Sequence, residues 1–312
     1  GGNSGVGKTT LADALTSIFG SHNTTVLRGD DMHKWHRGHD KWKEHTHLDP
    51  RANHLHKEIY FLKRLKSGRK IYRRHYDHDN GQFTTEKPIL AKNILIFEGL
   101  HPFFLAPQRL LYDMKIFVKP AKELQLHWKI IRDQANRGYD KERVLEAIEA
   151  REVDARKYID TQTNKSDFLI EVFPKKPIVN IGEKNELVDI YYQLSFSNEI
   201  YVEPLLDALG VEPRLNIRHE YSDNDTQTFS VSGICSSKFF TLLMYLTSLS
   251  KPISAPGGHS LLITFISVFI ITPLVIFTIQ RKLLWWRWWW CTYFYAFDCV
   301  HHTSLSVYLK CC

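Results

Sequence analysis

GNSGVGKT, residues 2–9, opens the chain and fits G-x-x-x-x-G-K-[ST], the pattern of a phosphate-binding loop. Glycines in this pattern let backbone N–H groups converge on the phosphates of a nucleotide, and the helix that follows adds its positive end. Lys8 is expected to reach the β- and γ-phosphates, and the Thr9 hydroxyl is expected to bind Mg²⁺. The predicted nucleotide-binding residues are Gly2, Asn3, Ser4, Gly5, Val6, Gly7, Lys8, Thr9 and Thr10.

A loop of this kind normally joins a buried strand to a helix, and only the helix is evident in this sequence. Residues 10–19 carry apolar side chains at helical spacing, and Gly20 is suited to end the helix. Only Gly1 stands before the loop. We therefore expect the first strand of the fold to be missing.

Short β-rich runs alternate with helical patterns over the first half of the chain. Strands are expected at residues 24–27, 93–97, 114–118 and 168–172, and helices at 49–66, 122–136 and 140–158. This alternation predicts an α/β fold, a doubly wound and mostly parallel sheet of the P-loop NTPase type.

The rest of the chain differs in character. Residues 175–240 contain short strand patterns at 188–196, 217–221 and 228–231 around a helical pattern at 202–209, which predicts an α+β extension on the sheet edge. Three parts are therefore expected: a P-loop core (1–174), the extension (175–240) and an anomalous tail (241–312).

Acidic residues follow two of the expected strands. Asp30 and Asp31 come after strand 24–27, and Glu98 comes after strand 93–97. Ligands of open α/β sheets bind outside the carboxyl ends of the strands, so these carboxylates are expected at the site. One aspartate is a candidate general base for an acceptor hydroxyl, and Glu98 is a candidate Mg²⁺ ligand beside Thr9. The alternative is that the aspartates only cap a turn.

Cationic residues on the helix 122–136 provide a candidate second anion site. Lys129 and Arg132 are three residues apart and share a face, and Arg137 lies beside the helix-ending Gly138. Arg suits bidentate phosphate binding and Lys suits a point charge on the transferring group. An ordinary solvated helix face remains the alternative, as does a solvated or phosphate-binding rim for the basic run 63–74.

Composition limits the classes of function. The formal charge of +7 suits anionic ligands, but no arginine-rich tail or base-stacking motif supports a nucleic-acid partner. All five cysteines lie at or after residue 235, which is a poor disulfide framework and favours a reducing, cytoplasmic setting. The spacing of His33, His36 and His39 alone does not complete a zinc site.

The tail from residue 241 has one acidic residue, Asp298, and five tryptophans within 285–290. Residues 261–279 are apolar and long enough to span a membrane. The positive flank lies C-terminal to them, however, which would place the P-loop on the outer side. We favour a frameshifted or mis-joined reading frame over a membrane anchor or a partner-binding segment.

Several further motifs occur in order through residue 174. They are GDDMH (29–33), Arg37, HLDPRAN (47–53), YDH (76–78), FEGLHP (97–102), WKIIRD (128–133), RG (137–138), EAR (149–151) and YID (158–160). In sequence and spacing this set resembles the phosphoribulokinase/uridine kinase family, and its EGLHP and H-L-x-P-x-A-N stretches resemble the phosphoribulokinase branch. Uridine kinases share the P-loop and the first aspartate.

The resemblance implies ATP-dependent phosphorylation of a sugar phosphate, with ribulose 5-phosphate as the expected substrate and Mg²⁺ as the cofactor. Asp30 matches the base that takes the proton of the sugar O1 hydroxyl, Glu98 the acidic Walker B residue, and Lys129 a lysine near the transferring phosphoryl group. The expected catalytic residues are thus Asp30, Lys8, Glu98 and Lys129, the expected metal ligands Thr9 and Glu98, and the expected sugar-phosphate ligands His33, Arg37, Arg132 and Arg137.

Other activities stay open from the residues alone. Uridine or another small hydroxyl compound is the alternative acceptor, and a nucleotide-binding regulator without an acceptor is the alternative of another class. A homodimer is a reasonable expectation from the edge strands of the extension. Val6 stands where plant and cyanobacterial members of the family carry a regulatory cysteine, so thiol switching at this position is not expected.

Overall fold

The computed structural model describes residues 1–184, 188–199, 215–222 and 224–233, with the backbone alone at 136, 137 and 215. The chain divides into two units, and all of these residues belong to the first, residues 1–258. Among the described residues no helix has the length and apolar character needed to cross a membrane. The apolar segment 261–279, the rest of the tail and the predicted helix 202–209 lie outside the described residues.

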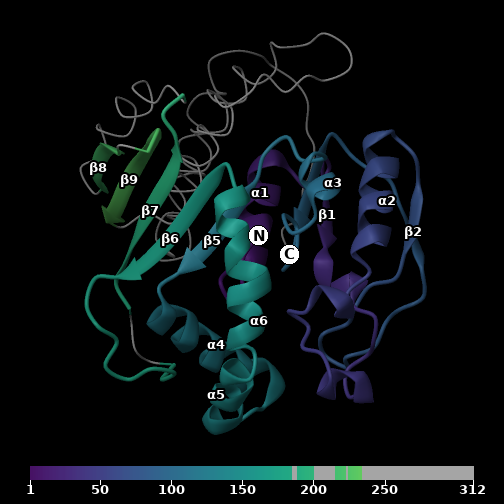
Figure 1. The fold of residues 1–312 in the computed structure, drawn as a ribbon, viewed down its shortest axis with the longest axis horizontal. Helices are drawn as coiled ribbons and strands as arrows, with labels where there is room; N and C mark the ends of the chain where they lie inside the picture. Colours follow the sequence, from purple (N-terminus) through teal and green to yellow (C-terminus); the bar gives the residue numbers. More distant parts are fainter. Residues whose placement is uncertain (185–187, 200–214, 223, 234–312) are drawn as a thin grey trace, which may run out of the picture. The chain divides into compact units, whose positions relative to one another are not determined.

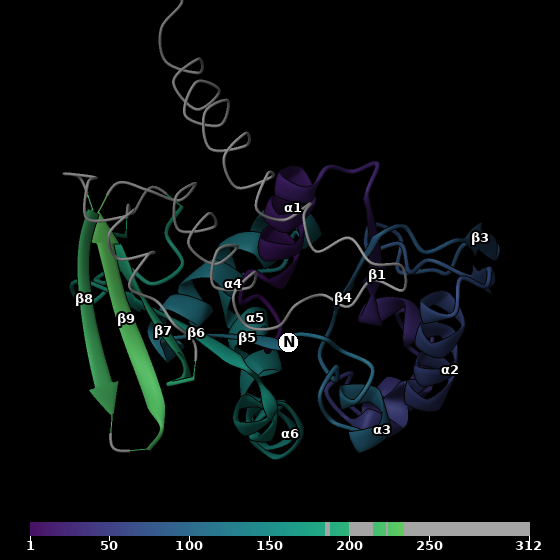
Figure 2. The same ribbon diagram turned by 90° about the horizontal axis from the view of Figure 1, so that it is seen from above.

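A short antiparallel pair of strands, β2 (Ile71–Arg73) and β3 (Lys87–Ile89), stands apart, and the other strands of the described residues form two sheets where one was predicted. The smaller has two parallel strands, β1 (Thr24–Arg28) and β4 (Ile94–Glu98), with Arg28 opposite Glu98. The larger has five strands in the order β5-β6-β7-β9-β8 (Figures 1 and 2). Its strands are β5 (Ile116–Pro120), β6 (Phe168–Pro174), β7 (Ile190–Ser197), β8 (Leu215–Ser222) and β9 (Thr226–Gly233).

The larger sheet is mostly antiparallel because its antiparallel pairs all involve strands of the predicted extension, whereas the core pairs β1–β4 and β5–β6 are parallel as expected. In this sheet only β5 and β6 pair in parallel, whereas β6–β7, β7–β9 and β9–β8 are antiparallel. The physical reason lies in the connections: β8 and β9 are joined by a short hairpin, which reverses the chain, and a parallel pair needs a long crossover. The strand part of the predicted edge extension is confirmed.

The phosphate-binding loop begins beside β5. Gly2 forms a parallel bridge with Val118, and the backbone N–H of Val118 donates to the carbonyl of Gly1 at 3.0 Å. Val6 is buried and packs with Val118 and Leu124 in the core of the larger sheet. The loop is therefore anchored by its one apolar side chain.

Helix ends governed by local signals follow the prediction. Helix α1 (Lys8–Phe19) ends at Gly20 with a φ of 84°, and α4 (Lys122–Arg137) ends at the left-handed Gly138. The turn at residues 79–81 joins two antiparallel segments, bridged between Tyr76 and Phe83. The remaining small elements are β2 (Ile71–Arg73), β3 (Lys87–Ile89) and α3 (Ala106–Arg109).

Two predicted helices are interrupted. Asp49 caps a single 3-10 turn (Pro50–Ala52), Asn53 is extended, and α2 (Leu55–Lys66) starts only afterwards. The other region, predicted as one helix over 140–158, consists of α5 (Lys141–Glu149), α6 (Glu152–Asp154) and a π turn (Ala155–Ile159), followed by a 3-10 segment (Asp160–Lys165). Local patterns miss both breaks because long-range contacts hold the chain there.

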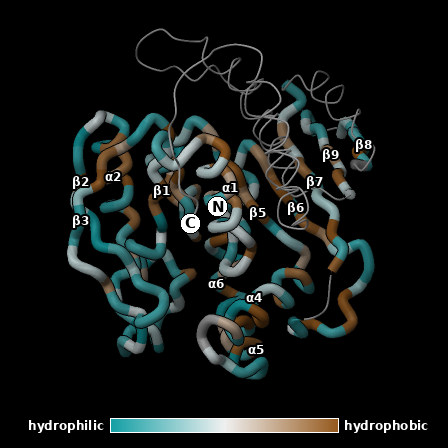
Figure 3. The backbone as a smooth tube through the Cα atoms, turned by 180° about the vertical axis from the view of Figure 1, so that it is seen from behind, coloured by the Kyte–Doolittle hydropathy of each residue, from teal (hydrophilic) through white to brown (hydrophobic). Residues whose placement is uncertain are grey.

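In the described part of the chain, three apolar clusters make up the core. The largest fills the space between α4 and the larger sheet, where the hydrophobic stretches of β5 and β6 run side by side (Figure 3). A second lies between α2 and the β1–β4 pair and includes Leu27, Phe61 and Leu65. The third contains Leu48, Phe117 and Ile159 and joins the π turn to the loop before the 3-10 turn. These clusters hold the carboxyl ends of β1 and β4 close to the phosphate-binding loop.

Candidate active site

The phosphate-binding loop has the conformation that its glycines permit. Gly5 and Gly7 have φ values of 79° and 89°, in the left-handed region that glycine adopts without strain. Lys8 and Thr9 form the first turn of α1, so the positive end of that helix faces the loop. The Lys8 ammonium donates to the carbonyl of Asn3 at 2.6 Å, which closes the loop on itself.

Lys8 is electrostatically linked to the carboxylates that follow β1 and β4. Burial lowers the pKa of Lys8, and the charges of Asp30 and Glu98 partly offset this by raising it, while Arg132 lowers it further. Charged groups from three other segments therefore act on the Lys8 ammonium. The charged groups of Lys8, Asp30, Glu98 and Arg132 therefore lie near one another.

Thr9 and Glu98 place two side-chain oxygen groups that can bind a metal ion next to each other. The Thr9 hydroxyl donates to the carboxylate at 3.1 Å from each oxygen, and Arg28 lies 3.5 Å from the same carboxylate. Burial raises the pKa of Glu98, and the neighbouring Lys8 and Thr9 oppose that rise. A hydroxyl and a carboxylate oxygen are donors that suit Mg²⁺, which usually takes its remaining ligands from water and substrate phosphates.

No larger metal cluster accompanies this pair. Within the described ranges, no group of three or more His, Cys, Asp or Glu side chains is arranged to hold a metal ion.

Asp30 occupies the one-turn 3-10 helix (Gly29–Met32) that follows β1. His78 lies 3.2 Å from its carboxylate and His33 lies 3.6 Å from it, and the side chain retains 35% exposure. Burial would raise the pKa of Asp30, but the His78 hydrogen bond and the charges of His33, His78 and Lys8 lower it overall. The carboxylate is therefore ionised and reachable, as a proton acceptor requires.

Asp31, the other candidate base, is turned away into a buried network. It accepts hydrogen bonds from the backbone N–H of Tyr76 at 2.8 Å and pairs with His75 at 2.9 Å and Arg73 at 3.3 Å. Arg73 in turn pairs with buried Glu58 at 2.7 Å. The sequence could not separate the two aspartates, whereas their surroundings favour Asp30 as the residue that faces a substrate.

One face of α4 packs directly on the phosphate-binding loop. Gln125 donates to the carbonyl of Ser4 at 3.2 Å, and a Cβ placed on Gly5 would lie 3.3 Å from the Cβ of Lys129 and 3.6 Å from Arg132. Lys129 is buried, and Arg132 pairs with Asp133 at 2.7 Å. The predicted Lys129–Arg132 face is thus at the loop. Arg137 ends the helix, but its side chain lies outside the described part of the structure.

Arg37 holds a loop in this structure. Its guanidinium donates to the carbonyls of His78 and Asp79, and its backbone N–H donates to the carbonyl of Gly81. Arg37 therefore fixes the segment that brings His78 to Asp30. Its predicted binding of a sugar phosphate stays a prediction.

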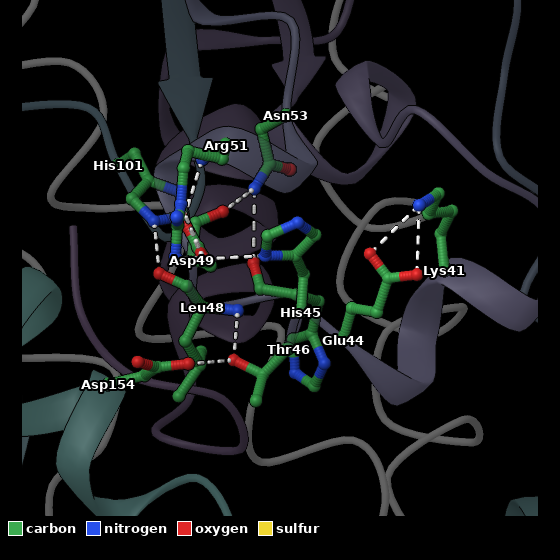
Figure 4. Close-up of polar contacts among 11 residues, drawn as sticks. Lys41, Glu44, His45, Thr46, Leu48, Asp49, Arg51, Asn53, His101 and Asp154 are labelled. Atoms are coloured by element: carbon green, nitrogen blue, oxygen red, sulfur yellow. Dashed lines mark hydrogen bonds and ion pairs between the residues drawn. The ribbon is translucent and has the colours of Figure 1, made fainter.

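The HLDPRAN stretch and the residues just before it are joined by a network of hydrogen bonds and ion pairs (Figure 4). Asp49 accepts from the backbone N–H of Arg51 at 2.8 Å and pairs with His45 at 3.0 Å, and the Thr46 hydroxyl donates to Asp154 at 2.7 Å. Burial lowers the pKa of His101 to about 4, so its neutral ring donates from Nε2 to the carbonyl of Leu48 at 2.7 Å. These contacts explain why the chain cannot continue as a helix from Asp49.

Sequence reasoning assigned no role to several residues that contact the site. They are His78 at Asp30, Arg28 at Glu98, Gln125 at the phosphate-binding loop and Asn53 at His33. The only signal for His78 and Asn53 was their place in the YDH and HLDPRAN motifs. Their contacts join segments far apart in the chain, which local patterns do not reveal.

The fold and the loop define an α/β protein of the P-loop class. The structure is similar to that of phosphoribulokinase from Rhodobacter spheroides, with a TM-score of 0.62 and 20% sequence identity over 80% of this chain and 96% of that one. At this identity the likeness establishes the fold.

Comparison of the sequence identifies the family to which the chain belongs. The model of the Phosphoribulokinase / Uridine kinase family matches residues 1–179, and the chain belongs to that family. It is 36% identical over 177 residues to a phosphoribulokinase of Synechocystis sp., covering 57% of this chain and 53% of the relative. It is 34% identical over 219 residues to the chloroplastic phosphoribulokinase of Spinacia oleracea, covering 64% and 54%. The chain spans about half the length of these relatives.

Proposed function

We propose that this protein transfers the γ-phosphoryl group of ATP to a hydroxyl of a phosphorylated sugar, with ribulose 5-phosphate as the substrate and ribulose 1,5-bisphosphate as the product. The observation that carries the proposal is the meeting of the phosphate-binding loop, Asp30, Glu98 and the Lys129–Arg132 face at one end of β1 and β4. The named relatives are phosphoribulokinases, which supports this substrate over other acceptors.

Asp30 serves as the general base in the proposed reaction. Its carboxylate is ionised and partly exposed, so it accepts the proton of the attacking hydroxyl as the O–P bond forms. A positioned base of this kind contributes roughly 10²–10⁴-fold to the rate. Positioning and charge neutralisation supply most of the remainder in phosphoryl transfer.

Cationic groups surround the proposed phosphoryl path. Lys8 and the N-terminus of α1 hold the β- and γ-phosphates, and Lys129 neutralises charge on the group in transfer. Thr9 and Glu98 would hold Mg²⁺, which would neutralise part of the negative charge of the nucleotide phosphates. His33, Arg37, Arg132 and Arg137 are the proposed ligands of the sugar phosphate.

A coupled assay of ADP release tests the choice of acceptor. The purified protein is supplied with Mg-ATP and with ribulose 5-phosphate, with uridine, or with no acceptor. We expect rapid ADP release only with ribulose 5-phosphate. Release with uridine alone would replace the proposed substrate, and release that is independent of any acceptor would favour a nucleotide-hydrolysing regulator.

A further inference from the structure

The buried ring of His33 is hydrogen-bonded to one buried amide side chain, that of Asn53. His33 and Asn53 are both buried, and Nδ1 of His33 lies 2.7 Å from Oδ1 of Asn53. Asn53 is the extended residue between the 3-10 turn capped by Asp49 and helix α2. The side chain of Asn53 therefore reaches His33 from a backbone position that the 3-10 turn and α2 fix on either side.

The orientation of the Asn53 amide is determined by its other contacts. Its Nδ2 lies 3.1 Å from the carbonyl oxygen of His47 and 3.0 Å from that of Asp49. Carbonyl oxygens only accept hydrogen bonds, so the atom facing both of them is the NH₂ group. The atom that faces His33 is then the amide oxygen, which also only accepts.

The tautomer of His33 follows from this orientation. Because Oδ1 of Asn53 accepts, Nδ1 of His33 must carry a hydrogen whatever the charge of the ring. The other nitrogen, Nε2, faces the site and lies 3.6 Å from Oδ1 of Asp30. In the neutral ring Nε2 carries a lone pair and accepts a hydrogen bond. In the charged ring Nε2 carries a hydrogen and donates a hydrogen bond.

We propose that Asn53 is a positioning residue that holds His33 in the form with hydrogen on Nδ1 and leaves Nε2 to the substrate. The role of this His33 form in substrate binding rests on the proposed function. The neutral ring then accepts a hydrogen bond from a sugar hydroxyl, whereas a phosphate oxygen is bound only by the charged ring. Asn53 thereby makes anion binding at His33 depend on full protonation of the ring.

The packing around His33 keeps the ring in this orientation. The rings of Trp42, Tyr76 and His47 lie at centroid distances of 5.6, 5.5 and 6.1 Å, two of them nearly perpendicular to it. Arg74 donates to the backbone carbonyl of His33 at 2.6 Å. The charged and titratable groups that face His33 are Asp30, His47, Tyr76, Arg74 and, more weakly, His101.

Nitrogen NMR of the full chain labelled with ¹⁵N-histidine tests the proposal without measuring activity. His33→Gln identifies the His33 signals by their loss. We expect neutral His33 to show a hydrogen-bearing Nδ1 and a bare Nε2. The opposite form in the unmodified protein would overturn the proposal, whether or not ribulose 5-phosphate is a substrate.

Variants at Asn53 provide the second arm. Asn53→Leu removes the acceptor, and we expect His33 to gain the form with hydrogen on Nε2, whereas Asn53→Asp keeps an acceptor and retains hydrogen on Nδ1. Asn93→Leu, in an exposed amide pair with Asn23, is the matched control that leaves His33 unchanged. An unchanged His33 tautomer in folded Asn53→Leu contradicts the proposal. If that variant does not fold, the measurement on the unmodified protein decides.

Discussion

Asp30 and Asp31 are neighbours with the same side chain and different chemistry. Asp30 stays partly exposed beside His78 and His33, whereas Asp31 is buried among Tyr76, Arg73 and His75. The parallel-strand rule places both at the sheet edge and cannot separate them. The distinction comes from segment 73–78, which is more than forty residues away in the chain.

His78 is expected to set the pH range in which Asp30 works. Its hydrogen bond and charge lower the pKa of Asp30 against the effect of burial, so His78→Ala should raise that pKa. Activity that needs ionised Asp30 is lost as pH falls through its pKa. The variant should therefore lose kcat/KM at higher pH than the unmodified protein, as measured by a pH–rate profile with Mg-ATP and sugar phosphate.

His56→Ala, at an exposed position on α2, is the control for this profile and should leave its acidic side unchanged. If the acidic limb of the pH–rate profile does not move in His78→Ala, the ionisation of Asp30 does not govern the reaction.

At the scale of the elements, signals close in the chain were predictable. The spacing of glycines and apolar residues correctly indicated α1, β1, β4, α4 and the ends of both helices. The missed features depend on distant partners. Asn53 breaks the predicted helix because it bonds to His33 and to the carbonyls of His47 and Asp49, and these contacts form only in the folded chain.

The buried pair of Glu58 and Arg73 joins α2 to β2 and is expected to matter for stability. Both side chains are 1% exposed and 2.7 Å apart, and Arg73 also donates to the carbonyl of Arg28 at the end of β1. Glu58→Leu leaves the arginine charge buried without this partner, which costs roughly 3–5 kcal/mol. Urea unfolding should show that loss in the free energy of unfolding.

The exposed pair of Lys57 and Glu86 provides the matched comparison. Nζ of Lys57 lies 3.8 Å from Oε1 of Glu86, and both side chains are about half exposed. Glu86→Ala should stay within ~0.5 kcal/mol of the unmodified protein. Equal losses in Glu58→Leu and Glu86→Ala would contradict the role given to the buried pair.

At the scale of the whole molecule, the site is assembled from segments spread over the first 133 residues. The phosphate-binding loop, the ends of β1 and β4 and one face of α4 could be placed together from the sequence, because strand order and motif spacing imply it. The segment that carries His78 could not, because a hydrogen bond network rather than a repeating pattern holds it. The sheet also divides differently from the prediction, since the β1–β4 pair is separate from the five-stranded sheet that contains β5 and β6.

The most direct measurement of the central claim is single-turnover phosphoryl transfer from ATP to ribulose 5-phosphate by Asp30→Asn. The side chain keeps its size and loses its basicity, so nucleotide binding should persist while transfer slows by roughly 10²–10⁴-fold. Nucleotide affinity, measured separately by titration, confirms that the phosphate-binding loop is intact. Transfer at an undiminished rate in a variant that binds ATP normally would contradict the account.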